Sequence, residues 1–252
     1  MSLKRSKVIM FLVLDIILLL PNVLMAKEQN EPILVNEVTK YYKTTINYFG
    51  QSLSNKSIDN NLFSSTVEIS ENEYESFNNE ISFENAFIET NYKKLSLAVY
   101  KVGNFYRYKS NLLWKKIPKT RSYDIFGIDY DDGLTIDGQV KFVKKYCFNT
   151  ENCHNSYNAT IKRFDSAIGV TFELPSGSLN YLESELSFDV KKKTNSTIKS
   201  QTVVSDYSHA IKTISLSNSQ SYSLNNNGII LGNISNYYDN INPVSILCSD
   251  NW

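Results

Sequence analysis

The sequence predicts an all-β protein, an antiparallel β-sandwich or a partly open barrel, preceded by an N-terminal signal peptide helix. Short segments in which apolar and polar residues alternate recur at roughly 10- to 15-residue intervals, as in sandwiches and barrels. The 17 Tyr and 13 Phe residues, with many Ser, Thr, Ile and Val, suit pleated, half-buried surfaces. No helical periodicity is long enough to support an α/β fold, which favours strands throughout the mature chain.

Residues 1–26 have the pattern of a secretory signal peptide. Three basic residues precede an apolar run over residues 8–20, which only Asp15 interrupts, and Ala26 is a small residue suited to a cleavage site. An uncleaved membrane anchor is the alternative, but a spanning helix needs about 20 apolar residues and this run has 13. We therefore expect a protein that is secreted or held at the extracellular cell surface, with no transmembrane segment after cleavage.

The charge balance argues against two classes of partner. The full chain has 26 basic and 26 acidic residues, and removing residues 1–26, with three cations and one anion, leaves 23 basic against 25 acidic residues. The resulting net charge of −2 provides neither the basic footprint of a nucleic-acid-binding protein nor a polybasic patch for a membrane surface. We expect the partner to be a surface glycan or a protein.

The mature chain is predicted to have two parts. Residues 27–80 are expected to form an N-terminal extension with one strand and a polar loop, and residues 81–252 the β-sandwich domain. The strand is placed at residues 35–48, where β-branched and aromatic residues outweigh a competing helical spacing. The loop is placed at residues 50–64, which are rich in Ser and Asn.

Local signals predict the other elements in order along the chain. Ser70, with Glu73 three residues later, predicts the start of a short helical turn. The clearest hairpin joins residues 95–100 to residues 105–114, because Gly103 supplies the positive φ that a tight turn needs. Further alternating segments are residues 122–130, 139–148, 154–164, 168–174, 185–190, 197–204, 209–216, 222–231 and 245–248.

Three cysteines follow the signal peptide in a chain that we expect to meet an oxidising environment. Cys147 and Cys153 are separated by five residues at the end of a predicted hairpin, so a local disulfide between them is geometrically reasonable. Cys248 is then left over, as a thiol or an intermolecular link. The alternative is that all three cysteines are reduced.

Asp129, Asp131 and Asp132 are the best candidates for metal ligands. Carboxylates two residues apart in a loop that contains glycine suit a hard cation such as calcium. The segment departs from the EF-hand pattern, because Gly133 occupies the fifth loop position instead of the sixth and Val140 replaces the glutamate at the twelfth. An acidic turn between two strands is the commoner explanation, and calcium is the one cofactor that the sequence brings into consideration.

Two arrangements would support a secreted hydrolase or transpeptidase. A cysteine nucleophile needs a histidine base, and the order His209 then Cys248 is similar to that of the sortases, although no basic residue follows Cys248 here. Glycoside hydrolysis needs two carboxylates that meet in space. The candidates for such a pair are Glu173, Glu183, Glu185 and Asp189. Alternating carboxylates are more typical of a solvated sheet face, and Cys248 of a small apolar residue on a terminal strand.

The aromatic residues Tyr106, Tyr108 and Trp114 are the candidates for a ligand-binding platform. Tyrosine and tryptophan offer a large contact area and a polar tip to a sugar or a peptide. Aromatic residues in the core or at the rim of a sandwich produce the same sequence pattern and are commoner. Both interpretations stay open at the level of the sequence.

Three segments carry a resemblance to known proteins. Residues 114–125 (WKKIPKTRSYDI), 172–178 (FELPSGS) and 206–210 (DYSHA) resemble segments of uncharacterised secreted proteins of low-GC Gram-positive bacteria. The resemblance covers roughly residues 35–252. It implies export across a single membrane, and it implies no activity, cofactor or catalytic residue.

Taken as a whole, the sequence favours a non-enzymatic extracellular module that binds a surface glycan or a protein. Export combined with aromatic-rich strands, in the absence of a recognisable catalytic motif, supports this function. The alternative is a secreted hydrolase or transpeptidase that uses Cys248 or a carboxylate pair. An assembling or pore-forming β-protein is a third possibility, for which the amphipathic hairpins are weak support.

Overall fold

The computed structural model of this chain describes residues 31–48, 62–77, 88–194, 196, 198, 200–239 and 241–249. The chain divides into two units, residues 1–32 and residues 33–252, and all the described strands and helices lie in the second unit. The signal peptide lies outside the described residues, so it stays a prediction. Among the residues that are described, no helix has the length and apolar character needed to cross a bilayer.

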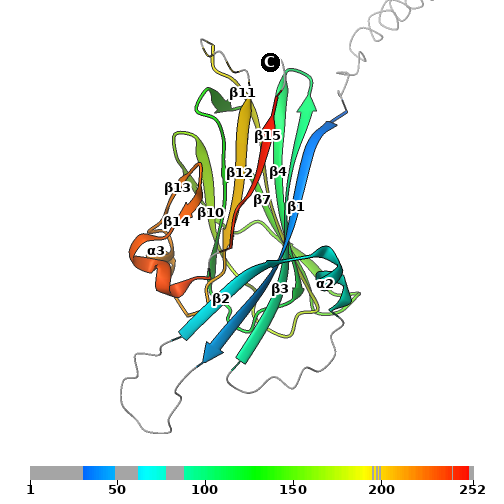
Figure 1. Cartoon of the computed structure of the whole chain (residues 1–252), viewed down its shortest axis with the longest axis vertical. Helices are drawn as coiled ribbons and strands as arrows, with labels where there is room; N and C mark the ends of the chain where they lie inside the picture. Colours follow the sequence, from blue (N-terminus) through cyan, green and yellow to red (C-terminus); the bar gives the residue numbers. More distant parts are fainter. Residues whose placement is uncertain are drawn as a thin grey trace, which may run out of the picture. The chain divides into compact units, whose positions relative to one another are not determined.

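Two antiparallel sheets form the sandwich (Figure 1). The larger sheet contains β1 (Ile33–Tyr48), β2 (Leu62–Ile69), β3 (Ile88–Val102), β4 (Phe105–Lys116), β6 (Leu134–Ile136), β7 (Lys141–Cys147), β8 (Cys153–Ser156) and β11 (Tyr181–Lys192). The smaller sheet contains β5 (Tyr123–Asp129), β9 (Thr160–Arg163), β10 (Ala167–Glu173), β12 (Gln201–Ser208) and β15 (Val244–Cys248). The strand orders are β2-β1-β3-β4-β11-β7-β8, with β6 also paired to β11, and β15-β12-β5-β10-β9. The predicted antiparallel β-sandwich is confirmed, with two separate sheets instead of a partly open barrel.

The main hydrophobic core lies between the two sheets. Strands β4 and β11 of the larger sheet alternate buried and half-exposed residues, so one face of that sheet meets the core and the other meets solvent. Leu95, Leu97 and Val99 of β3 meet Ile128 and Val170 of the smaller sheet in this core. The alternation that predicted strands in the sequence is the direct consequence of this one-sided burial.

The three central strands of the smaller sheet, β5, β10 and β12, are buried on both faces. Nearly every residue of β5, β10 and β12 is buried. The outer face of this sheet is covered by residues 210–238, called the cover segment below, and a second apolar cluster joins Ile125 of β5 to Ile214, Tyr222 and Ile234 of this segment. The cover segment contains α3 (Leu216–Ser219), β13 (Ser223–Asn225), β14 (Gly228–Ile230) and the 3-10 helix η1 (Gly232–Tyr237), drawn in orange in Figure 1.

Two glycines allow the cover segment to approach the sheet closely. A Cβ atom added at Gly169 of β10 would lie 2.4 Å from the hydroxyl oxygen of Tyr222. A Cβ atom added at Gly127 of β5 would lie 2.5 Å from a methyl carbon of Leu224. Glycine in a strand often marks such a close approach of another segment.

Several predictions are confirmed at the level of single elements. The strand expected at residues 35–48 is β1, and the expected hairpin is β3–β4, with Gly103 at a φ of 60° in its turn. The short helix α2 (Glu71–Ser76) begins as the sequence indicates. The hydroxyl oxygen of Ser70 accepts a hydrogen bond from the backbone N–H of Glu73 at 3.1 Å, which caps the helix.

The structure does not divide the chain at residue 80 into an extension and a sandwich. β1 pairs with β3 along almost its whole length, from Ile33 opposite Lys101 to Asn47 opposite Ile88, and β2 extends the same sheet. Residues 27–80 therefore contribute two strands to the larger sheet, where the sequence predicted one strand of an extension. Pairing between strands that are far apart in the chain leaves no mark on local alternation, so the sequence did not indicate it.

Three of the predicted strands are also corrected. Residues 209–216 and 222–231 fall largely in the cover segment: residues 209–215 are irregular chain with one isolated bridge from Ala210 to Tyr238, and residues 222–231 contain the short hairpin β13–β14. Residues 154–164 divide between β8 in the larger sheet and β9 in the smaller one. A segment that covers a sheet also buries one of its sides, so it alternates much as a half-buried strand does.

We expect the substitution Gly169→Ala to lower the free energy of unfolding by about 1–3 kcal/mol, because the added methyl group must displace Tyr222 from the second apolar cluster. Chemical denaturation measures this change. Tyr222→Leu removes the ring and hydroxyl that the methyl group would meet, so the combined variant should lose less than the sum of the two single variants. Simple additivity of the two losses would contradict the close approach.

Candidate functional site

The predicted aromatic platform is not at the surface. The exposed fractions of Tyr106, Tyr108 and Trp114 are 2%, 0% and 3%, because all three lie on the face of β4 that meets the core. The Tyr108 hydroxyl donates a hydrogen bond to Oε1 of Gln201, and burial raises the pKa of this phenol well above its ordinary value. The ligand-binding role predicted for these three residues is therefore wrong, and they belong to the core.

The cysteine and histidine proposed for a transpeptidase lie at opposite ends of β12. Cys248 pairs in register with Gln201, the first residue of β12, whereas His209 follows the last residue of that strand. Eight residues of extended chain span about 26 Å, which is far beyond the reach of a nucleophile and its base. Cys248 is also 3% exposed, so the structure supports its interpretation as a small buried residue on a terminal strand.

The four carboxylates proposed for a hydrolase lie on two different sheets. They are Glu173 on β10 and Glu183, Glu185 and Asp189 on β11. Lys109 Nζ lies 2.7 Å from Oε2 of Glu185, and Arg107 donates to both carboxylate oxygens of Asp189, at 2.7 and 3.0 Å. These contacts are cross-strand ion pairs on the solvated face of β4 and β11, as alternating charged residues often form.

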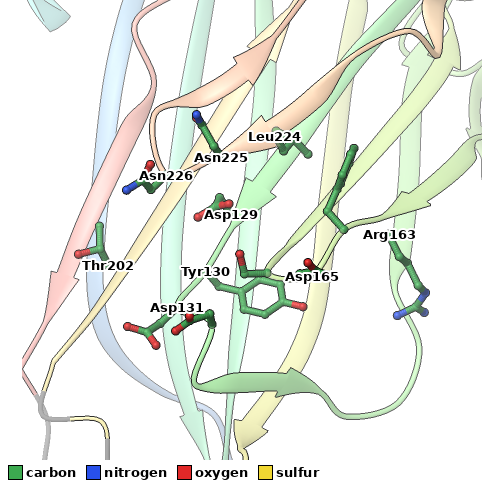
Figure 2. A pocket seen from close by; sticks show the side chains of 12 residues that line it. Asp129, Tyr130, Asp131, Arg163, Asp165, Thr202, Leu224, Asn225 and Asn226 are labelled. Atoms are coloured by element: carbon green, nitrogen blue, oxygen red, sulfur yellow. The ribbon is translucent and has the colours of Figure 1, made fainter.

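An open pocket with a volume of about 830 Å³ lies between the smaller sheet and the cover segment (Figure 2). Three turns line it: residues 129–132 at the end of β5, residues 163–166 at the end of β9 and before β10, and residues 224–226 at the end of β13. Thr202 of β12 completes the lining. Because these segments are anchored on paired strands, the pocket rests on a rigid support.

Polar groups dominate the lining of the pocket. The carboxylates come from Asp129, Asp131, Asp132 and Asp165, the guanidinium from Arg163, the amides from Asn225 and Asn226, and the hydroxyls from Ser166 and Thr202. Phe164, Leu224 and Tyr130 add apolar surface. Figure 2 shows Asp129 between the two amides of the hairpin turn and the carboxylate of Asp131.

Hydrogen bonds in the turns fix this arrangement. The carboxylate of Asp131 accepts from the backbone N–H of Gly133 at 2.8 Å, and the side-chain oxygen of Asn225 accepts from the backbone N–H of Asn227 at 2.9 Å. Asp129 is the most buried carboxylate of the pocket, and its burial raises its pKa to about 6. The pocket therefore contains one carboxyl group that changes charge in mildly acidic solution.

The predicted calcium site gains no support from this geometry. Asp129, Asp131 and Asp132 all line the pocket, but no three histidine, cysteine or carboxylate side chains among the described residues are arranged to hold a metal ion. The Asp131 oxygen is also engaged by the backbone of its own turn. The three residues line the pocket, and calcium binding by them stays a prediction.

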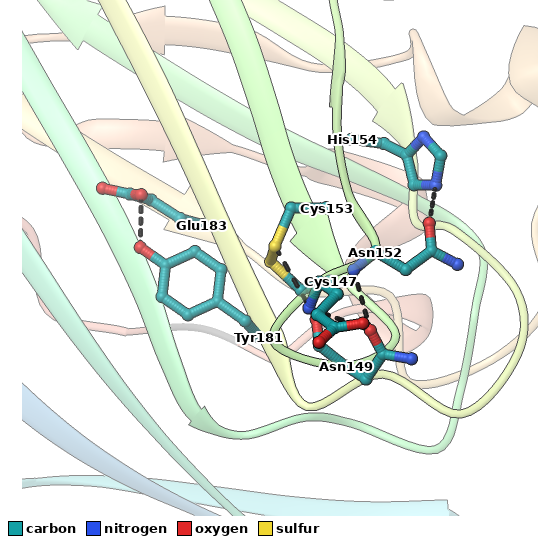
Figure 3. Close-up of a disulfide and its surroundings, with 8 residues drawn as sticks. Cys147, Asn149, Asn152, Cys153, His154, Tyr181 and Glu183 are labelled. Carbon is teal, nitrogen blue, oxygen red and sulfur yellow. Dashed lines mark hydrogen bonds between the residues drawn. A yellow bond between two sulfur atoms is a disulfide. The ribbon is translucent and has the colours of Figure 1, made fainter.

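The predicted disulfide between Cys147 and Cys153 is present (Figure 3). The two cysteines are direct partners in the pairing of β7 with β8, which brings their side chains together. Asn149 closes the turn between them, because its side-chain oxygen accepts from the backbone N–H groups of Glu151 at 3.0 Å and Asn152 at 2.7 Å. The disulfide therefore fixes the hairpin at the edge of the larger sheet.

A second polar site, which was not among the sequence-based predictions, lies buried between the sheets. Lys93 of β3 and Asp239, which precedes β15, have exposed fractions of 0% and form a salt bridge. The carboxylate of Asp239 also accepts from the hydroxyl of Thr44 at 3.2 Å and from the backbone N–H of His209 at 2.8 Å. Each oxygen of this carboxylate thus has at least one donor.

Asp124 forms the second half of this buried polar cluster. Its carboxylate accepts hydrogen bonds from the Tyr207 hydroxyl and from the backbone N–H of Ala210 at 2.9 Å, and it lies 3.0 Å from Nδ1 of His209. Burial and the neighbouring charge of Asp124 raise the pKa of the Tyr207 phenol far above its ordinary value. The side chains of Asp124, Tyr207 and His209 are fully buried.

Period-two alternation in the sequence carries one signal for this cluster. Lys93 has the same parity as Leu95, Leu97 and Val99, so the pleat places its side chain toward the core. A charged residue at an inward position is rare unless it is paired. The partner Asp239, however, lies in irregular chain, and no local pattern points to it.

No family model matches this chain, and no curated protein matches it. One chain of a crystallised cohesin–dockerin complex is 17% identical over 40% of this chain and 71% of that chain, with a TM-score of 0.27. The full-length major pilin SpaD from Corynebacterium diphtheriae is 12% identical over 67% of this chain, with a TM-score of 0.31. This chain spans 54% of the pilin chain. At these TM-scores neither similarity bears on activity, ligand or partner.

We expect the paired substitution Cys147→Ser and Cys153→Ser to lower the free energy of unfolding by about 2 kcal/mol, since the disulfide closes only a short loop. Denaturant unfolding without reductant measures the difference. With reductant present, the parent protein should fall to the stability of the variant, which controls for effects of serine itself. Equal stability without reductant would contradict a stabilising disulfide.

We expect stability to fall as the pH rises from about 4 to about 6, in part because of Asp129. Its raised pKa lets the folded protein bind more protons than the unfolded chain in this window. Asp129→Asn cannot bind or release a proton, so this loss of stability is absent from the variant. Between about pH 4 and pH 6, the free energy of unfolding of the variant should therefore rise by on the order of 1–3 kcal/mol relative to that of the parent. Asn226→Ser, in the same pocket, should run parallel to the parent. Denaturant unfolding across this pH range checks both, and a parallel curve for Asp129→Asn would contradict the shift.

Proposed function

We propose that this chain is an exported, non-enzymatic β-sandwich module that binds a hydroxyl-rich glycan in the pocket at Asp129. The observation that carries the proposal is the convergence of carboxylate, amide and guanidinium groups from three turns on an open pocket. Binding groups on turns that a rigid sheet supports are a common arrangement in recognition modules.

The chemistry of the lining favours a neutral or weakly charged polyol. Sugar hydroxyls both donate and accept, so they can satisfy carboxylates, which only accept, and amides, which do both. Phe164 and Leu224 offer the apolar surface against which the C–H face of a sugar ring packs. Four carboxylates against the single cation Arg163 disfavour a polyanion, which agrees with the weak net charge of the chain.

Export is supported by two independent features of the chain. Residues 1–26 have the charge and apolar pattern of a secretory signal peptide. Cys147 and Cys153 pair as a disulfide, and such bonds persist mainly in oxidising environments outside the cytoplasm. An extracellular location places the pocket where surface glycans are available.

One observation favours a glycoside hydrolase as a second candidate. Asp129 has a raised pKa, and other carboxylates line the same pocket, so a general acid and a second carboxylate are both available. Release of reducing sugar from the glycan that binds would separate the two functions. In that case Asp129→Asn should abolish release while binding persists, whereas a binding module releases no sugar from any bound glycan.

A glycan array probed with the exported protein tests the binding function. We expect Arg163→Ala and Asn226→Ala to weaken the strongest signal about tenfold or more, because each removes a polar group from the pocket. Lys141→Ala and Asn155→Ala, matched exposed residues on β7 and β8, should leave the signal unchanged. Absence of any glycan signal, or equal loss in all four variants, would overturn the proposal.

A further inference from the structure

The contact between Lys93 and Asp239 joins two reactive groups in the interior of the protein. The amine and the carboxylate touch, and neither side chain is exposed. The Lys93 Nζ atom lies 5.1 Å from the ring centroid of Trp114 and 5.5 Å from that of Tyr207. The rings of Trp114 and Tyr207 therefore flank the contact between the amine and the carboxylate and exclude water from it.

The local backbone holds Lys93 in this position. Its direct partners in the sheet are Tyr42 on β1 and Trp114 on β4, both buried. The pairing of β3 with β4 shifts register between Tyr92 and Lys93, and such bulges re-aim the side chains beside them. Packing on both sides therefore fixes the Lys93 side chain and limits the conformations it can adopt as it approaches Asp239.

A buried ion pair stabilises a protein poorly, because the loss of hydration of both ions opposes folding. Removing an ammonium and a carboxylate from water costs several kcal/mol for each ion, and their attraction often fails to offset that cost. In surroundings of low polarity, moving one proton from nitrogen to oxygen replaces the two charges by a neutral amine and a carboxylic acid. These two neutral groups are the reactants of amide formation.

We propose that Lys93 and Asp239 condense to form an intramolecular amide bond. The neutral Nζ attacks Cγ of Asp239, the Cγ–Nζ bond forms, and the Cγ–Oδ2 bond breaks. Oδ2 leaves as water, carrying the proton that it first received from Nζ and a second proton from the same nitrogen. No atom is oxidised or reduced, and no co-reactant is needed.

Neighbouring groups are placed to assist this step. The backbone N–H of His209, 2.8 Å from Oδ1, stabilises the negative charge that develops on that oxygen when the amine adds. The hydroxyl of Thr44, 3.2 Å from Oδ2, can pass a proton to the leaving oxygen. The fixed contact of amine and acid supplies the high effective concentration that an uncatalysed condensation in water lacks.

Asp124 acts as a positioning residue for the reaction. It holds the His209 side chain through Nδ1 at 3.0 Å and anchors the next backbone N–H, that of Ala210, at 2.9 Å. These contacts fix the peptide whose N–H faces Asp239. The amide would therefore form only after β12 and β5 have paired and brought Asp124 into place.

The bond would tie together distant parts of the chain. Lys93 and Asp239 are 146 residues apart, and the bond would link β3 of the larger sheet to the segment that leads into β15, the last strand of the smaller sheet. Closing so long a loop restricts the unfolded chain more than the short disulfide does. The cross-link would resist reductants, which distinguishes it from the disulfide.

Peptide mass spectrometry of the folded, exported parent protein tests the proposal directly. After reduction and trypsin digestion, we expect one branched peptide that joins residues 57–94 to residues 213–252, because trypsin does not cut after an acylated lysine. Its mass should equal the sum of the two linear peptides less one water molecule. Recovery of only the linear peptides from folded parent protein would overturn the proposal.

Variants separate the chemistry from the fold. Lys93→Arg and Asp239→Ala should lose the branched peptide completely, whereas Lys94→Arg, at the adjacent half-buried position on the opposite face of β3, should retain it. The exposed ion pair of Lys191 with Asp137, at 2.8 Å, should give linear peptides only, because contact without burial is not sufficient.

The rate of water loss after synthesis tests the assisting groups. Thr44→Val and Asp124→Asn should each slow the mass change about tenfold. Folded variants that react at the parental rate would overturn their assigned roles. The readout is independent of ligand binding, so failure of the glycan array would leave the amide proposal standing.

Discussion

Burial of the central strands of the smaller sheet on both faces is the constraint on which the rest of the structure depends. Strands β5, β10 and β12 are buried along almost their whole length, so this sheet needs a partner on each side, since either face left open would expose the apolar residues of these strands to solvent. The larger sheet covers the inner face, and the cover segment at residues 210–238 covers the outer one. Gly127 and Gly169 allow that cover to approach closely.

The same constraint produces the pocket. The cover segment packs tightly where Leu224 and Tyr222 meet the two glycines, and the pocket lies where the sheet meets the turns after β5 and β9. Polar side chains at this margin sit between a dry apolar cluster and solvent, which explains why Asp129 is buried enough to have a raised pKa while Asp132 and Arg163 are exposed. The gradient of polarity follows from the layering of the fold.

Local periodicity predicted the parts of the structure that depend on neighbours in the sequence. The β3–β4 hairpin, the cap at Ser70 and the pairing of Cys147 with Cys153 involve residues close together in the chain. Period-two alternation shows that a segment has two faces and not which face is buried, so it left open whether Tyr106 lies in the core, where the structure places it, or on a binding surface. The candidate site could be predicted only through Asp129 and its neighbours, because Arg163 and the β13–β14 turn reach the pocket by tertiary contacts.

The buried polar cluster shows that polar residues that face the core matter more to the protein than those that face solvent. An exposed pair such as Lys191 with Asp137 can be lost at little cost, because water replaces each partner. Removing either Lys93 or Asp239 leaves an unpaired charge buried away from water. This destabilises the protein several times more than the loss of an exposed ion pair does. Apolar side chains at these two positions would stabilise the fold more than the ion pair does. Keeping both charged residues therefore lowers the stability of the protein, unless the pair has a further role. A covalent bond between them would be such a role, because it removes both charges and fixes the segment that leads into β15 to β3 in the larger sheet.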